Sequence, residues 1–377
     1  MSSAATDHSR PLRVGIVGIG TYAMGTNVPN LRRTGRAEVV AIARRDPLRL
    51  RIAQEALGVP QAYADGQDLI ERAEIDAVVV GTPHHAHARP TIAALDRGLH
   101  VLVDKPLALT SADARAMVEA GDRAAAHGRV LVVGYANRLN GLWRAAKQAL
   151  AAGEIGTVRQ VCVAWASDHR WFWEAETLPE AFVRAQAGRG VPEPFFGDRR
   201  LEADWRREPD KMGGGMFADR GAHNVNVALW LADAAPAEVV AFGENAGLPV
   251  ECFLTVQGRL DNGVLVSFAA ASGVAEGNEL RVLVFGDRGT MEVTGQGTSP
   301  TAVVLHRDGA SRTLAPLGPS MNAAEHFVAC ALDGAANLSP APDAARAVAF
   351  AEATYRSLAA RQPVAAESPS PRPPPSP

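Results

Sequence analysis

Short apolar runs rich in β-branched residues alternate with amphipathic segments in the first third of the chain. The runs have the length of buried strands, and the segments between them carry apolar residues at helical spacing. The expected strands are 13–20, 38–43, 76–82, 100–105 and 130–135, and the expected helices are about 25–34, 46–57, 66–72, 87–97 and 110–127. This alternation is typical of βαβ units and predicts a doubly wound α/β domain with a parallel sheet over residues 12–135.

A different pattern follows a helical segment at 140–153, because strand-like runs then succeed one another with few helices between them. Connections of hairpin length, such as Asp261-Asn262-Gly263, predict a C-terminal α+β domain over 136–363 with a large, mostly antiparallel open sheet. Helices near 216–232, 320–334 and 343–361 are expected to cover one face of this sheet. The apolar character of the strands favours pairing of the other face with a second copy of the chain, as a homodimer or homotetramer.

The ends of the chain differ from the rest in composition. Residues 1–11 are small and polar, and residues 364–377 end in a proline-rich run, so both are expected to be disordered tails. Net charge is −3, which argues against a nucleic-acid partner. No apolar run reaches the roughly 20 residues of a membrane span, and the three cysteines are far apart. These features favour a cytoplasmic protein without a disulfide framework or membrane partner.

A glycine motif follows the first expected strand and precedes a helix-period segment. Gly18, Gly20 and Ala23 occupy the small-residue positions of G-x-G-x-x-G/A, with Thr21 and Tyr22 between them. Such a turn brings the backbone close to a pyrophosphate at a helix N-terminus, so these five residues are expected to bind a dinucleotide in a Rossmann domain. The alternative is a chance glycine turn, which the βαβ context makes less favourable.

The end of the second expected strand indicates which dinucleotide is bound. A carboxylate here would accept hydrogen bonds from the adenosine ribose, but this chain presents Arg44 and Arg45 instead. Guanidinium groups fork onto phosphate oxygens, so the pair favours NADP, with NAD possible. Ordinary solvated surface arginines are the open alternative.

Three ordered motifs carry a resemblance to a known family. They are Gly81-Thr82-Pro83-His84-His85-Ala86-His87, the segment 100–107 with Asp104-Lys105-Pro106, and Gly213-Gly214-Gly215 followed by Asp219, Gly221 and His223. On these motifs residues 12–360 resemble the glucose-fructose oxidoreductase / inositol dehydrogenase / rhizopine catabolism (Gfo/Idh/MocA) family. Two positions depart from the family pattern: Asp104 replaces the usual Glu, and Asn226 stands where Asp is frequent, which puts the support of the active-site helix in question.

The resemblance implies that Lys105, Asp219 and His223 are catalytic. The residues themselves agree, because Asp219 and His223 are four apart and share a helix face, where the carboxylate can fix one tautomer of a general base. Lys105 follows a parallel strand at the edge where ligands of open sheets bind. A surface lysine and a buried structural histidine are the respective alternatives.

The two loops after the third and fourth expected strands are expected to contact the cofactor. His84 and His87 are assigned to the nicotinamide half, whereas His85 is expected to be structural or solvated. A zinc site at these histidines is the disfavoured alternative, and no metal is expected. The expected cofactor contacts in these loops are Thr82, Pro83, His84, His87, Asp104 and Lys105.

Together these features predict an NADP-preferring dehydrogenase or reductase acting on a secondary alcohol of a sugar, sugar derivative or polyol. By resemblance, His223 accepts the hydroxyl proton, Asp219 orients it and Lys105 polarises the oxygen. One alternative uses tightly held NAD transiently for elimination or glycosidic cleavage, and a less favoured one is a non-catalytic dinucleotide-binding regulator. Trp165, Trp171, Trp173 and Trp205 are equally compatible with a sugar pocket and with core packing.

Overall fold

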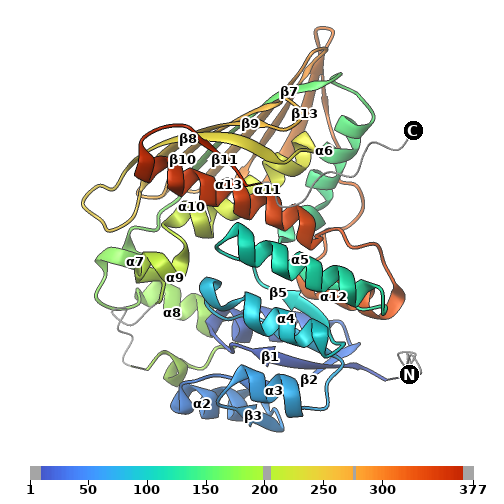
Figure 1. Ribbon diagram of the computed structural model, residues 1–377, viewed down its shortest axis with the longest axis vertical. Coiled ribbons are helices and arrows are strands. Elements are labelled where there is room, and N and C mark those ends of the chain that lie inside the picture. The colour runs from blue at the N-terminus through green and yellow to red at the C-terminus, as the bar shows by residue number, and fades with distance from the viewer. Residues whose placement is uncertain (1–9, 198–204, 275–276, 368–377) are drawn as a thin grey trace.

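Two sheets, one above the other, organise the computed structural model, which describes residues 10–197, 205–274 and 277–367 (Figure 1). The lower sheet belongs to the N-terminal part of the chain and the upper sheet to the C-terminal part. The expected tails at 1–11 and 364–377 fall mostly outside the described residues.

The lower sheet is parallel throughout, with strand order β3-β2-β1-β4-β5-β6. This order confirms the Rossmann arrangement, in which two mononucleotide-binding halves meet between β1 and β4. All five expected strands are present, and the short β3 is an additional one. The strands are β1 (Leu12–Val17), β2 (Ala37–Ala43), β3 (Gln61–Tyr63), β4 (Ala77–Val80), β5 (His100–Val103) and β6 (Leu131–Val133).

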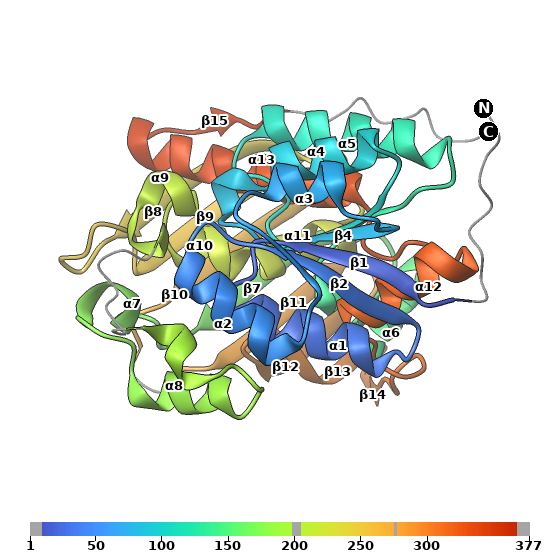
Figure 2. The ribbon, with the colours of Figure 1, turned by 90° about the horizontal axis from the view of Figure 1, so that it is seen from below.

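Helices cover both faces of this sheet, as the alternating sequence pattern predicts (Figure 2). One face packs against α3 (Gly66–Arg72), α4 (Ala88–Asp96) and α5 (Ser111–Ala125). The other face packs against α1 (Val28–Arg33), which continues the π-helical turn η1 (Ala23–Asn27), and α2 (Pro47–Leu57).

Helix α12 (Ala323–Asp333) corrects one expectation, because it packs on the lower sheet and not on the C-terminal one. Phe327 and Val328 belong to the same buried cluster as Leu102 and Val132 of the Rossmann strands. The helical pattern at 320–334 is right, but an apolar stripe does not specify which of two sheets it covers.

The upper sheet has nine strands in the order β14-β13-β12-β11-β7-β10-β9-β8-β15. Every pair is antiparallel except β7 and β10, which are parallel at its centre. The strands are β7 (Val158–Ala166), β8 (Pro236–Glu244), β9 (Phe253–Leu260), β10 (Leu265–Ala271), β11 (Glu279–Gly286), β12 (Thr290–Gln296), β13 (Ser299–Arg307), β14 (Ala310–Thr313) and β15 (Val364–Ala365). Strand β15 pairs with β8, so the folded part of the chain extends past the expected boundary at residue 363.

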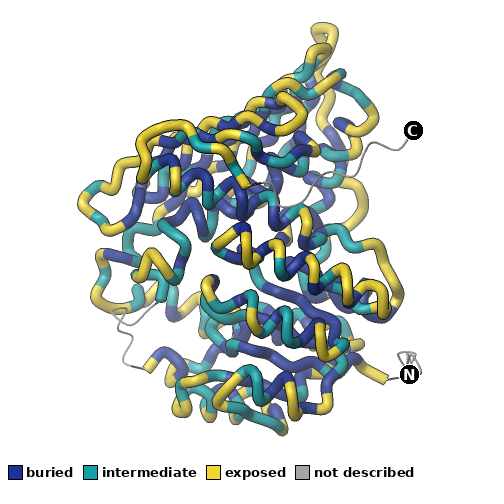
Figure 3. The backbone as a smooth tube through the Cα atoms, in the orientation of Figure 1, coloured by how far each residue is buried: buried dark blue, intermediate teal, exposed yellow. Residues whose placement is uncertain are grey.

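One face of the upper sheet packs against α6 (Gly141–Ala151), α11 (Gly221–Ala232) and α13 (Ala341–Ala360). Helix α13 contributes to the core of the upper sheet through Phe350 and to the core of the lower domain through Val348. The opposite face alternates with the buried one along each strand and is partly to fully exposed (Figure 3). Within the described residues, no helix has the length and hydropathy needed to cross a bilayer.

The chain between β7 and α11 forms a series of short helices beside the end of the Rossmann sheet. They are α7 (Trp171–Glu174), α8 (Glu180–Ala187), η4 (Glu193–Phe196), η5 (Trp205–Arg207), α9 (Pro209–Met212) and α10 (Met216–Asp219). Phe195 and Phe196 are buried against the lower domain, in the cluster that contains Ile19 and Ile42.

A buried arginine just after β6 connects α11 to α13. Arg138, 2% exposed, donates from Nε to Asn226 Oδ1 at 2.9 Å and from Nη1 to Asp343 Oδ2 at 2.7 Å. Its guanidinium also lies 4.9 Å from the centre of the Trp230 ring. Asn226 donates its amide to the Asp343 carbonyl at 3.3 Å, so asparagine at this position makes two hydrogen bonds and supports α11 without a second carboxylate.

We expect Asp343→Asn to lower the free energy of unfolding by about 2–3 kcal/mol, because it leaves the buried Arg138 charge uncompensated. Urea unfolding measures the change. Asp308→Asn is the control, since Asp308 is exposed and its ion pair with Arg307 is worth less than about 1 kcal/mol. Equal effects of the two substitutions would show that Asp343 does not balance Arg138.

Candidate active site

The turn after β1 has the geometry that the glycine motif requires. Gly18 has a φ of +89°, and a Cβ there would meet the Thr82 nitrogen at 2.7 Å. A side chain is therefore excluded both by conformation and by the neighbouring loop. A Cβ on Gly20 would meet nothing closer than the Gly18 carbonyl at 4.0 Å, so this residue borders open space at the start of the helix. That space is where a pyrophosphate approaches a Rossmann turn.

Arg44, at the end of β2, lies against this turn. Its Nη1 donates to the Ile19 carbonyl at 2.8 Å, and its guanidinium is 5.1 Å from the centre of the Phe195 ring. Its Nε is buried and has no hydrogen-bond partner. Burial lowers the pKa of Arg44, with Arg49 adding to the effect. Arg45, in contrast, is exposed. The two neighbouring arginines, which sequence analysis considers together, therefore have different surroundings.

The three histidines in the loop after β4 differ in burial. His85 is exposed, as expected. His84 is buried, with Nδ1 3.0 Å from the Met212 carbonyl and Nε2 3.8 Å from Asp219 Oδ1, and burial lowers its pKa to about 3. Thr82, half-buried beside Pro83, donates its hydroxyl to the Ala86 carbonyl at 3.0 Å.

His87, which is expected to contact the nicotinamide, points into the protein. Its ring is fully buried, with Nδ1 2.8 Å from the Pro106 carbonyl and Nε2 2.9 Å from the Thr82 carbonyl. Both ring nitrogens are thus used within the protein, and His87 ties the loop after β4 to the loop after β5. Sequence spacing places a histidine in a loop but does not show which way the ring points.

Asp104 and Lys105 follow β5 and point to different neighbours. Asp104 accepts hydrogen bonds from Asn27 Nδ2, 3.3 Å from each carboxylate oxygen, and burial raises its pKa to about 6. Lys105 Nζ donates to the Asp219 carboxylate and, at 3.1 Å, to the Asp219 carbonyl. The lysine of the Rossmann domain and the aspartate of the C-terminal domain therefore form an ion pair across the domain boundary.

Asp219 differs from its expected role. Asp219 is the last residue of α10, whereas His223 lies in α11, and Arg220 lies between the two helices. The single helix expected over 216–232 is therefore two elements. The carboxylate binds Lys105 rather than holding the imidazole of His223. Burial alone would raise the pKa of Asp219, but the positive charge of Lys105, with Arg206 adding to it, outweighs burial and holds that pKa well below its usual range.

His223 is half-buried beside this ion pair. Its Nδ1 is buried without a hydrogen-bond partner, and its ring packs edge-on against Tyr135, with the ring centres 5.7 Å apart. Burial, together with the Lys105 charge, lowers its pKa to about 3. The imidazole is therefore neutral at physiological pH.

Residues outside the predicted catalytic set also border this cluster, and of these Arg220 is the one that sequence reasoning missed. Trp205 packs against His84 at a ring-centre distance of 4.6 Å, and Arg220 hydrogen-bonds His169. Burial and the neighbouring Arg220 lower the pKa of His169 to about 4. Arg220 lies inside the D-x-G-x-H motif, at a position where the motif leaves the residue type unspecified.

The tryptophans divide between core and site. Trp165 and Trp173 are buried in the core of the upper sheet, while Trp205 lies beside His84. Trp171 stacks on Phe172 at 3.8 Å between ring centres. Packing explains why position 221 is a glycine, because a Cβ there would lie only 3.0 Å from the Phe217 ring.

Both parts of the chain match models of one protein family. Residues 12–135 match the model of the GFO_IDH_MocA oxidoreductase family with an NAD-binding Rossmann fold, and residues 143–292 match the GFO/IDH/MocA C-terminal domain. A 1,5-anhydro-D-fructose reductase of Ensifer adhaerens is 28% identical over 82% of this chain and 84% of its own length. A myo-inositol 2-dehydrogenase of Thermotoga maritima is 27% identical over 78% of each chain.

Other matches are shorter or concern the fold alone. An uncharacterized oxidoreductase of Rhizobium meliloti is 33% identical, but over only 40% of this chain and 44% of that protein. The crystal structure of an oxidoreductase domain protein from Kribbella flavida has a TM-score of 0.76 at 24% identity, over 95% of this chain and all of that one. The two consecutive domain matches and the shared architecture lead to one conclusion: the chain belongs to the GFO/IDH/MocA family of oxidoreductases.

Proposed function

We propose that this oxidoreductase prefers NADP and transfers a hydride between the nicotinamide and a secondary alcohol or ketone carbon of a sugar, sugar derivative or polyol. The observation that carries the proposal is the Lys105–Asp219 ion pair, which lies beside a neutral His223 at the carboxyl edge of the Rossmann sheet. The names of the two long matches, an anhydrofructose reductase and an inositol dehydrogenase, support this substrate class.

The residues around the glycine turn fit a dinucleotide. Gly20 borders open space at the helix start, as a bound pyrophosphate requires. The buried, unpartnered Nε of Arg44 is a donor at the position where the adenosine 2′ group meets the end of β2. The adenosine and pyrophosphate half of the cofactor would be held by Gly18, Gly20, Thr21, Tyr22, Ala23 and Arg44. The other residues expected to border the cofactor are Arg45, Thr82, Pro83, His84 and Asp104.

In the proposed catalytic cluster, one group stabilises negative charge on the substrate oxygen and another accepts its proton. The ammonium of Lys105 has three donors, of which two engage Asp219, so the third is available to a substrate oxygen. That contact stabilises developing alkoxide in the transition state. The neutral His223 would accept the hydroxyl proton and return it in the reverse direction, and a bound nicotinamide would supply the hydride chemistry at the same carbon.

We expect His223→Ala or Lys105→Ala to lower kcat by roughly 100-fold, the usual scale for an acid/base group. A panel of sugars and inositols, followed by nicotinamide absorbance and product analysis, identifies the substrate and measures the loss. His127→Ala and Lys211→Ala are controls at exposed positions. Near-normal turnover in both active-site variants would overturn the assignment, and product formed without net cofactor reduction would favour the transient-redox alternative.

We expect the His223 imidazole to remain neutral from pH 8 down to pH 5, because burial lowers its pKa to about 3. A histidine with an ordinary pKa near 6.5 would gain its proton across this range. Nitrogen-15 NMR of labelled histidines, with the His223 signal assigned by its loss in His223→Gln, measures the state directly. Titration of that signal near pH 6.5 would contradict a desolvated base.

We expect Arg44→Asp to reverse the cofactor preference. One charge-assisted contact to a 2′-phosphate contributes about 1.5–3 kcal/mol, or roughly 10- to 150-fold in affinity, and an aspartate would repel that phosphate. Binding constants for NADP and NAD, together with kcat/KM for each, give the ratio. Arg51→Asp, at an exposed site on α2, is the control for a general change of charge. If Arg44→Asp leaves the ratio of the NADP and NAD constants unchanged, the NADP assignment is wrong.

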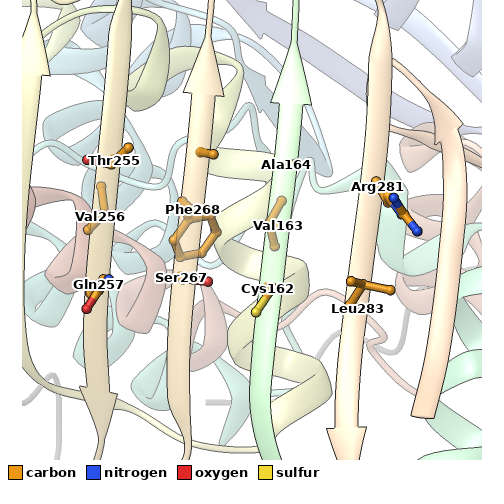
Figure 4. A pocket seen from close by; sticks show the side chains of 11 residues that line it. Cys162, Val163, Ala164, Thr255, Val256, Gln257, Ser267, Phe268, Arg281 and Leu283 are labelled. Carbon is orange, nitrogen blue, oxygen red and sulfur yellow. The ribbon is translucent and has the colours of Figure 1, made fainter.

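We also propose that the open face of the upper sheet pairs with a second copy of the chain. Small and neutral side chains occupy the centre of this face, among them Cys162, Ala164, Ser267 and Thr255 (Figure 4). Larger apolar groups are exposed on the same face, with Phe242 71% and Leu265 45% exposed. A sheet face of this composition favours burial against another sheet.

We expect light scattering to show a dimer or tetramer at micromolar concentration. Ala164→Arg should shift the protein towards monomer, because it places a charge at the centre of the proposed interface. Ala125→Arg, on the exposed side of α5, should leave the mass unchanged. A wild-type monomer would show that the sheet face remains exposed to solvent.

A further inference from the structure

Two buried polar side chains from outside the active site hold the start of α10. The Tyr355 hydroxyl, on α13, accepts hydrogen bonds from the Gly215 and Ala218 N–H groups, each at 3.1 Å. Glu251, in the segment between β8 and β9, accepts one from the Phe217 N–H at 3.3 Å. The tyrosine in turn donates to Glu251 Oε1 at 2.8 Å. The Gly215 and Phe217 N–H groups at the helix start thereby gain acceptors, and the Ala218 N–H, which also donates to the Gly215 carbonyl at 3.2 Å, gains a second one.

The same two side chains explain the glycine run that precedes α10. Gly214 has a φ of +122°, and a Cβ there would overlap the Tyr355 ring. A Cβ on Gly215 would overlap the Glu251 carboxyl group. These glycines therefore allow close approach of Tyr355 and Glu251, rather than serving only as a flexible entrance to the helix.

Burying this pair is costly, and the proposed reaction makes no direct use of it. Glu251 is only 7% exposed, and burial raises the pKa of its carboxyl group and of the Tyr355 hydroxyl. Buried polar groups of this kind stabilise a structure only when their hydrogen bonds are satisfied, and then they fix one arrangement. Here the backbone bonds of both groups go to the single turn of helix that ends in Asp219.

We propose that Glu251 and Tyr355 are positioning residues that set the place of Asp219 against Lys105. Helix α10 is only four residues long and cannot hold itself in place, because one turn of helix is unstable alone. The bond to the Ala218 N–H fixes the backbone immediately before Asp219, whose carboxylate and carbonyl both accept from Lys105. The inference rests on the proposed function only where it treats Lys105 and Asp219 as catalytic.

Lysine reactivity tests the positioning without any substrate. The chain has three lysines, Lys105, Lys147 and Lys211, so labelling by trinitrobenzenesulfonate can be followed at each by mass spectrometry. The reagent attacks uncharged, unpaired amines, and an amine that loses its carboxylate partner reacts faster. We expect Tyr355→Phe to speed labelling of Lys105 at least threefold while Lys147, which donates to the Trp230 carbonyl, stays unchanged. Thr354→Val is the matched control, since its buried hydroxyl bonds only within α13.

Kinetics separates positioning from a purely structural role. We expect Tyr355→Phe and Glu251→Ala to lower kcat about tenfold and to raise the primary deuterium isotope effect on kcat, with cofactor affinity unchanged. Glu251→Gln keeps an acceptor for Phe217 and Tyr355 and should restore most of the activity.

The outcomes are distinct. Unchanged Lys105 labelling in both Tyr355→Phe and Glu251→Ala, whatever their melting temperatures, would overturn the proposal. So would a Glu251→Gln variant as impaired as Glu251→Ala. If the wild type turns over no sugar or polyol, the proposed function fails, and the labelling result still decides whether the pair positions Asp219.

Discussion

The ion pair between Lys105 and Asp219 is the interaction on which the rest of the site depends. It connects the end of β5 in one domain to the end of α10 in the other. A largely buried pair of this kind is stable only when its remaining donors and acceptors are satisfied, because each ion loses most of its hydration. The Asp219 carbonyl meets part of that need, and the surrounding histidines add no charge of their own, since burial keeps His84 and His223 neutral. Asp219 thus supplies the negative charge that pairs with Lys105, beside histidines that are neutral.

Neutral histidines also affect what the cluster can recognise. An uncharged imidazole can accept a proton or a hydrogen bond from a hydroxyl, whereas an imidazolium would only donate. The mixture of one ammonium, one carboxylate and neutral rings suits a substrate rich in hydroxyl groups. Trp205, which packs on His84, adds an apolar face at the same place.

Local sequence signals predicted the fold well where one residue pattern determines one structure. The β-branched runs and helical segments gave the parallel sheet, and Gly18 has the positive φ that its motif demands. They did not predict the location of α12, because its apolar stripe fits either sheet and only the tertiary packing selects the lower one. Likewise, β3 and β15 are too short to leave a periodic signal.

In the candidate site, too, local signals predicted some features and missed those that depend on tertiary contacts. The motifs located Lys105, Asp219 and His223 together, but the four-residue spacing indicated a contact between Asp219 and His223 that competition from the Lys105 ammonium replaces. His87 turned inward because two backbone carbonyls bind its ring, which a loop sequence cannot reveal. Tyr355 and Glu251 lie more than a hundred residues apart along the chain, so no local pattern could have linked them.

The placement of α12 and α13 has a consequence for how the chain is divided into parts. The sheet of the N-terminal domain is completed by residues that follow all but the last strand of the C-terminal sheet: α12 covers Leu102 and Val132, and the Ser339 carbonyl accepts from the Val133 N–H at the edge of β6. A fragment ending at residue 135 would expose this apolar surface and an unpaired strand edge to water. The Rossmann unit is therefore a domain by topology whose hydrophobic core is completed by a helix from near the end of the chain.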